Sequence, residues 1–184
     1  MRRILMTALV AAFAPMLAMA QGGMSSGNPV SSAVRMMAAQ HGRVLLEGAE
    51  EMPADKYSYH PTAGQMTFGH LIMHLVMSNN FMCSAIAGEK RPMVKVSDTD
   101  PKAKLVDALK SSFDYCNSVL DKTNDSELGA KVPFFRGEAP RAEVMIAFVA
   151  DLYDHYSQMA GYLRLNGLLP PTAQHSRRRM PMKH

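Results

Sequence analysis

Two side chains in the C-terminal part of the chain have types and a spacing that could bind a metal. Asp151 and His155 are four residues apart, in a segment where Val144, Phe148 and Met159 repeat with the period of a helix. Side chains four apart on a helix stack on one face, so the carboxylate and the imidazole should both point inward with the apolar residues. Burying such a pair is costly unless a partner compensates them. A divalent metal is one such partner.

Further histidines fall on other predicted helices. His70 and His74 are four apart in the segment 67–87, and His41 lies on the apolar side of the segment 29–51. Helix bundles build metal sites from inward side chains of facing helices. Three protein ligands with one open position are usual for catalytic zinc, and imidazole with carboxylate also suits nickel, iron or manganese.

The position of each of these residues can also be explained without a metal. A single histidine on a helix is usually a hydrogen-bonded boundary residue, and we favour this explanation for His41 and His70. Asp151 could orient an imidazole as an outer partner. It could also pair with an arginine such as Arg35 or Arg164.

The elements that must position these residues are four long helices. Their apolar periodicity predicts helices over about 29–51, from Thr62 or Thr67 to about 87, from about 101 to at least 120, and from 140 to about 166. Residues 124–137 are predicted to be irregular, with 132–135 packing back on the bundle. No segment alternates convincingly as a strand does. The sequence therefore predicts an all-α fold, a four-helix bundle.

The two ends of the chain differ from the domain between them. Residues 1–20 have a charged start, an apolar run and the small-residue ending Ala18-Met19-Ala20, which is typical of a signal peptide. We expect an exported protein, periplasmic or secreted, with a bundle domain over 21–172. The apolar run is too short for a convincing membrane span. Residues 173–184 have no helical period, and we expect a basic, disordered tail.

The charge distribution argues against nucleic-acid binding. The formal net charge of +4 arises at the ends. The first twenty residues hold two arginines, and the tail holds Arg177, Arg178, Arg179 and Lys183 without an acid. The domain itself carries a small excess of acidic residues, so a basic surface for nucleic acid is not supported.

Cys83 and Cys116 both lie on apolar helix stripes. Export would permit a disulfide between them. Two buried, separate thiols are the alternative.

Three groups of residues together resemble the DinB-like superfamily of four-helix bundle proteins. They are Tyr57-Ser-Tyr-His-Pro-Thr62, then Thr67-Phe-Gly-His-Leu-Ile-Met-His74-Leu75, then His155-Tyr-Ser-Gln158 with Tyr162-Leu-Arg-Leu-Asn-Gly-Leu-Leu-Pro-Pro171. The similarity extends from about residue 30 to 171. Similar exported members of the superfamily also carry cysteines in the second and third helices. Cys83 and Cys116 fall in the predicted second and third helices of this chain.

The resemblance implies a metal site. Members usually use a histidine of the second helix and an H-x3-H pair of the fourth, which implies His74, Asp151 and His155 as ligands here. Asp151 stands where the family has histidine. Aspartate can ligate the same metals, and His70 is an alternative source of the third imidazole. The implied cofactor is a divalent metal, with zinc or nickel favoured.

The implied activities are those of relatives. These include thiol-dependent transferases and isomerases as well as metal-dependent hydrolases. An exported member would lack ready access to a cytosolic thiol, so we favour a metal-dependent hydrolase acting on an unknown small molecule. A non-catalytic bundle that holds a metal or small ligand is the alternative, followed by a thiol-dependent transferase. No general base is evident, because Asp154 lies off the inner face of its predicted helix. A homodimer is compatible with this fold.

Overall fold

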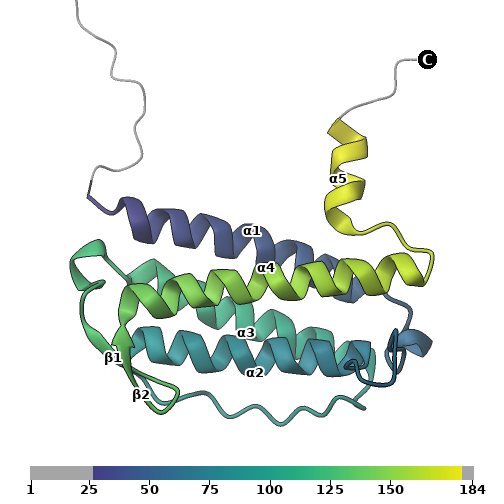
Figure 1. Ribbon diagram of the computed structural model, residues 1–184, viewed down its shortest axis with the longest axis horizontal. Helices are drawn as coiled ribbons and strands as arrows, with labels where there is room; N and C mark the ends of the chain where they lie inside the picture. Colours follow the sequence, from purple (N-terminus) through teal and green to yellow (C-terminus); the bar gives the residue numbers. More distant parts are fainter. Residues whose placement is uncertain (1–26, 180–184) are drawn as a thin grey trace, which may run out of the picture.

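The computed structural model describes residues 27–179, which form a four-helix bundle with a short hairpin and a C-terminal helix (Figure 1). The predicted all-α four-helix bundle is confirmed. Its elements are α1 (Pro29–Glu51), η1 (Ala54–Lys56), α2 (Phe68–Ala87), α3 (Lys102–Lys122), η2 (Asp125–Glu127), β1 (Lys131–Phe134), β2 (Gly137–Pro140), α4 (Arg141–Leu165) and α5 (Pro171–Arg179).

The connection between α2 and α3 sets the direction of the helices. It returns along the length of the bundle, so α3 begins at the same end as α2 (Figure 1). As a result α2 and α3 run in one direction, and α1 and α4 run in the other. The antiparallel neighbours α2 and α4 therefore bring the beginning of one helix beside the end of the other.

The start of α2 is fixed by Thr67, which settles the choice between the two candidate caps. The Thr67 hydroxyl oxygen accepts a hydrogen bond from the His70 N–H at 3.1 Å. The Thr62 hydroxyl instead donates to the side chain of Gln65. A helix that starts at Phe68 places His70 and His74 in its first two turns.

The interior is apolar, with the two cysteines in its middle. Leu45, Phe68, Leu75 and Phe148 are fully buried. Cys83 of α2 and Cys116 of α3 are also buried, and their side chains meet in the geometry of a disulfide, with Cα atoms 5.3 Å apart.

The segment predicted to be irregular contains a small β-hairpin. Strands β1 and β2 are antiparallel, with Val132 opposite Ala139 and Phe134 opposite Gly137. Val132 and Ala139 are buried against the bundle. The expected packing of 132–135 is met by Val132 and in part by Phe134, whereas Pro133 and Phe135 are exposed. Each strand has only four residues, and this is too short for alternation to be visible in the sequence.

The helix α5 corrects the prediction of a disordered tail from residue 173. The hydroxyl of Tyr156 accepts from the Thr172 N–H at 2.9 Å, and the Gln174 amide donates to the Glu51 carboxylate at 2.7 Å. His175 Nε2 lies 3.1 Å from a carboxylate oxygen of Glu47. These contacts are polar, so an analysis of apolar periodicity could not find the helix. The predicted signal peptide and residues 180–184 lie outside the described residues.

None of the helices described between residues 27 and 179 is long and apolar enough to cross a membrane.

Gly69 permits a close approach at the start of α2 and is a sensitive position. A Cβ atom there would overlap the carbonyl oxygen of Asp98 and lie 3.3 Å from that of Tyr57. We expect Gly69→Ala to destabilise the protein by about 1–3 kcal/mol, because backbone atoms must shift. The Tm measured by calorimetry should fall by several degrees. Gly129→Ala, which meets nothing within 4 Å, is the control. An unchanged Tm for Gly69→Ala would contradict this packing.

Candidate metal centre

Three potential ligands converge between α2 and α4. His74 comes from the second turn of α2, and Asp151 and His155 come from adjacent turns of α4. One ligand atom from each residue lies within 4.8 Å of the others. Among the described residues this is the one group of three or more His, Cys, Asp or Glu side chains that could hold a metal. We call these residues the triad.

The contacts inside the triad are short. Asp151 Oδ1 lies 3.3 Å from His155 Nε2. The imidazole rings of His74 and His155 pack edge to face, with centroids 4.7 Å apart. His155 is buried, whereas His74 and Asp151 are partly exposed. The triad is therefore anchored on its inner side by His155 and accessible from the surface past the other two residues.

Ser78 holds the carboxylate of Asp151 in place. The Ser78 hydroxyl donates to Asp151 Oδ2 at 2.7 Å and leaves Oδ1 directed at His155. Ser78 lies one turn after His74 on the same side of α2. Sequence reasoning missed this residue, although its spacing from His74 would have placed it on the correct face.

The pKa values of the triad depend on burial and on the neighbouring charges. Burial alone would lower the pKa of His155, but its hydrogen bond to the Asp151 carboxylate and the charge of that group raise it. Burial alone would raise the pKa of Asp151, but hydrogen bonds from His155 and Ser78 lower it. Burial and the neighbouring His155 lower the pKa of His74. His74 is thus favoured as a neutral imidazole, the form that binds metals.

The donor set fits a divalent ion of intermediate softness. Two imidazole nitrogens and one carboxylate oxygen are suitable ligands for zinc or nickel. His155 Nδ1 is buried without a hydrogen-bond partner among the described residues. The contact of Nε2 with Asp151 satisfies the other ring nitrogen only, so the burial of Nδ1 is uncompensated and costs free energy.

The other candidate residues lie outside the triad. His70 Nδ1 is 3.2 Å from Asp98 Oδ2, on a half-exposed side chain, and His70 is not part of the cluster. The ring of His41 stacks on Tyr153 with centroids 3.5 Å apart.

The arginines considered as partners of Asp151 are also engaged elsewhere. Arg35 pairs with Asp121 at 3.1 Å, and Arg164 donates to the carbonyl of Ala160.

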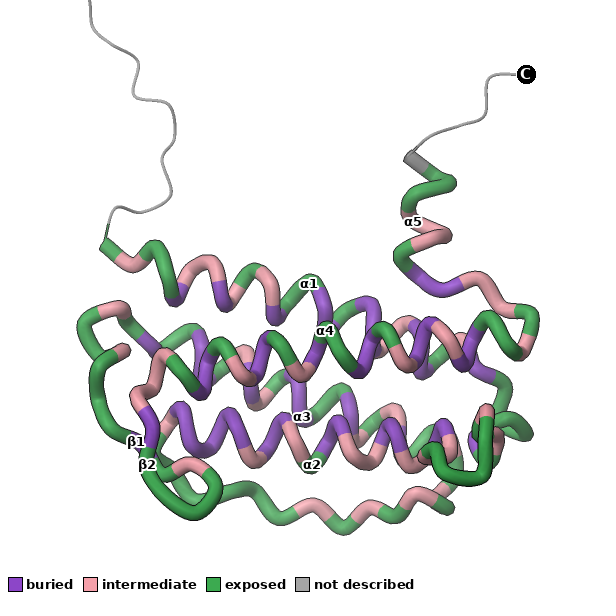
Figure 2. Tube along the Cα trace, in the orientation of Figure 1, coloured by how far each residue is buried: buried purple, intermediate pink, exposed green. Residues whose placement is uncertain are grey.

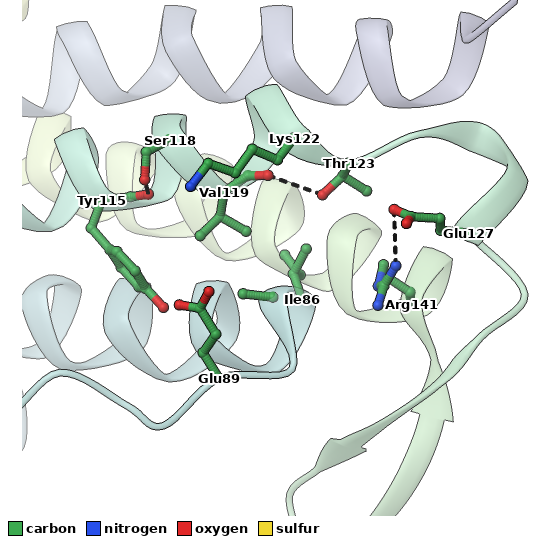
Figure 3. A pocket seen from close by; sticks show the side chains of 10 residues that line it. Ile86, Glu89, Tyr115, Ser118, Val119, Lys122, Thr123, Glu127 and Arg141 are labelled. Carbon is green, nitrogen blue, oxygen red and sulfur yellow. Dashed lines mark hydrogen bonds and ion pairs between the residues drawn. The ribbon is translucent and has the colours of Figure 1, made fainter.

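A separate pocket of about 350 Å³ lies at the far end of α2 and does not include the triad (Figure 3). The ion pair between Arg141 and Glu127, at 3.1 Å, closes one side of it. Glu89 and Tyr115 line another side, and burial followed by the Glu89 charge raises the pKa of Tyr115. Its lining contains no histidine or cysteine, so it offers no comparable metal site.

A sequence profile of the DinB superfamily matches residues 37–159, a range that includes the whole triad. The chain belongs to the DinB superfamily. No protein of curated function matches it significantly.

Solved structures show the same fold at low sequence identity. A DinB-like protein from Bacillus subtilis is 18% identical, with a TM-score of 0.63 over 73% of this chain and 92% of that one. A DinB-like protein from Bacillus cereus is 15% identical, with a TM-score of 0.65 over 76% and 95%. A mutant of mycothiol-dependent maleylpyruvate isomerase is 15% identical, with a TM-score of 0.56 over 68% of this chain and 58% of the isomerase.

Proposed function

We propose that this DinB superfamily protein binds one divalent metal ion, zinc or nickel, through His74, Asp151 and His155, and that it hydrolyses a small molecule there. The observation that carries the proposal is the convergence of three ligand atoms from two helices within 4.8 Å. The fixed carboxylate of Asp151 adds support, because a ligand held by an outer partner is already oriented for binding.

The residues around the triad define what this site could do. A bound metal with an open position would lower the pKa of a coordinated water and so provide a nucleophile near neutral pH. His155 is buried and would hold the inner side of the site, while the partial exposure of His74 and Asp151 leaves the outer side accessible to a substrate. Ser78 keeps Asp151 from rotating towards solvent.

We also propose export, to the periplasm or the medium, on the basis of residues 1–20. In an exported protein a cytosolic thiol cofactor would be out of reach. This consideration favours hydrolysis over a thiol-dependent reaction.

Two alternatives rest on specific observations. The cluster contains no further acid or base beyond its three potential ligands among the described residues, and this favours a non-catalytic metal-binding protein. The similarity to a mycothiol-dependent isomerase favours a thiol-dependent transfer or isomerisation.

A substrate screen distinguishes these functions. Purified protein is offered esters, amides and phosphoesters before and after chelation, after metal is restored, and with small thiols added. We expect turnover that chelation removes, that metal restores and that His74→Ala abolishes, with His70→Ala as the matched control. Turnover that survives both chelation and His74→Ala would contradict the proposal. Bound metal without turnover would indicate the binding protein, and turnover only with a thiol would indicate the transferase.

A further inference from the structure

The tip of the β1–β2 hairpin combines two unfavourable features in one residue. Phe135 follows β1 directly and has a φ of 50°, in the left-handed region where glycine and asparagine are favoured and bulky residues are rare. Its side chain is 80% exposed to water. The positive φ suits the turn of a two-residue hairpin, but glycine or asparagine would adopt it at lower cost than phenylalanine, and the exposed ring does not help to close the turn.

Phe135 extends an aromatic cluster that joins the hairpin to α2. Phe81 of α2 stacks on Phe134 with centroids 5.7 Å apart, and Phe135 lies 5.3 Å from Phe81 and 4.5 Å from Phe134. We call these three residues the aromatic tip. The cluster anchors the hairpin through Phe134, which is partly buried, whereas Phe135 remains exposed.

The chain that leaves α2 adds positive charge and another exposed apolar side chain. The Arg91 guanidinium carbon lies 5.5 Å from the Phe81 ring centroid, which places this connection against the aromatic tip. Met93, two residues further, is 89% exposed.

The two segments, 88–95 and 131–138, carry an excess of cations. They contain Lys90, Arg91, Lys95, Lys131 and Arg136 against Glu89 and Glu138. None of these five cations makes an ion pair within the described residues. Some cations elsewhere on the bundle form such pairs, such as Lys104 with Asp100 and Lys110 with Asp114, whereas Lys122 and Arg164 form none within the described residues.

We propose that the aromatic tip and its surrounding cations dock the protein on an anionic phospholipid surface. An exposed aromatic ring gains free energy when it enters the boundary between headgroups and acyl chains, and nearby lysines and arginines are attracted to anionic lipids. The exposed hairpin turn lies at one end of the bundle (Figures 1 and 2). Small ligands bind in concave sites that enclose them, and an exposed turn offers no such site. A deformable phospholipid surface can instead accept an exposed turn. This proposal does not depend on the metal centre.

Vesicle co-sedimentation tests the proposal with the folded protein. We expect the protein to bind vesicles that mix phosphatidylcholine with phosphatidylglycerol, and to bind vesicles of phosphatidylcholine alone more weakly. Binding to the mixed vesicles should weaken as the salt concentration increases. Phe135→Asn should reduce the partition coefficient about tenfold, because the ring is lost while asparagine tolerates the positive φ. The pair Arg91→Gln with Arg136→Gln should reduce it by roughly 25-fold, because each charge is worth on the order of fivefold.

Leu165→Asn is the matched control, because Leu165 is an exposed apolar residue, 63% accessible, at the other end of the bundle. Its partition coefficient should equal that of the unmodified protein, and circular dichroism should show all variants folded. The proposal fails if the unmodified protein does not bind anionic vesicles at low salt, or if Phe135→Asn binds as well as Leu165→Asn. Sedimentation analysis without lipid adds a third test. A change from dimer to monomer in Phe135→Asn would make the tip a self-association surface and overturn the proposal.

Discussion

Replacing His155 with alanine is expected to abolish binding of a divalent metal almost completely. His155 is the most buried member of the triad and is directed at Asp151, 3.3 Å away. Its loss would remove a ligand and leave a void at the inner side of the site. The decrease in affinity should exceed the roughly 10–100-fold that the loss of an outer partner costs. Ser78→Ala, which frees the Asp151 carboxylate, should show that smaller effect.

The matched control for His155→Ala is His70→Ala. His70 lies one turn from His74 on the same helix but pairs with Asp98 outside the cluster, so its loss should leave metal binding unchanged. Elemental analysis of protein purified without a histidine tag gives the stoichiometry, and calorimetric titration of metal-free protein gives the affinity. Equal metal content in His155→Ala and the unmodified protein would refute the site.

Asp151 needs its own pair of variants, because it stands where relatives of this superfamily are expected to carry histidine. Asp151→Ala should weaken binding strongly, whereas Asp151→His should retain a metal by supplying an imidazole on the same turn of α4. Full metal content in Asp151→Ala would mean that the aspartate only orients His155 and is not a ligand.

The fold was predictable because each main helix carries an apolar stripe. The predicted limits of the first helix, 29–51, agree with α1. The hairpin and α5 were not predictable in this way. The strands are too short to show alternation, and α5 is held by polar contacts such as those of Gln174 with Glu51.

The site was only partly accessible from local spacing. The four-residue spacing places Asp151 beside His155 on one helix, and it equally places His70 beside His74. Spacing within a helix does not reveal which turn of α2 faces which turn of α4. The antiparallel packing of these helices selects His74 for the triad, places Ser78 against Asp151 and leaves His70 beside Asp98.

Loss of the link between Cys83 and Cys116 is expected to destabilise the bundle strongly. The two residues are 33 positions apart, so a bridge would close a loop of that size in the unfolded chain. Restricting such a loop is worth about 3–4 kcal/mol in the chain-entropy description. For a domain of this size, the double variant Cys83→Ala with Cys116→Ala should therefore show a Tm lower by about 10 °C. Alanine avoids introducing a polar group, because both sites are fully buried.

The effect of a reductant separates a bridge from two well-packed thiols. Reduction should lower the Tm of the unmodified protein towards that of the double variant and leave the double variant unchanged. If the cysteines were separate thiols, the reductant would have no effect on either protein, and two thiols would react with a labelling reagent after denaturation. Cys83 lies nine positions after His74 on α2, and both cysteines are outside the triad. Metal affinity measured well below the Tm should therefore be similar in both proteins, because the bridge acts mainly on the unfolded chain.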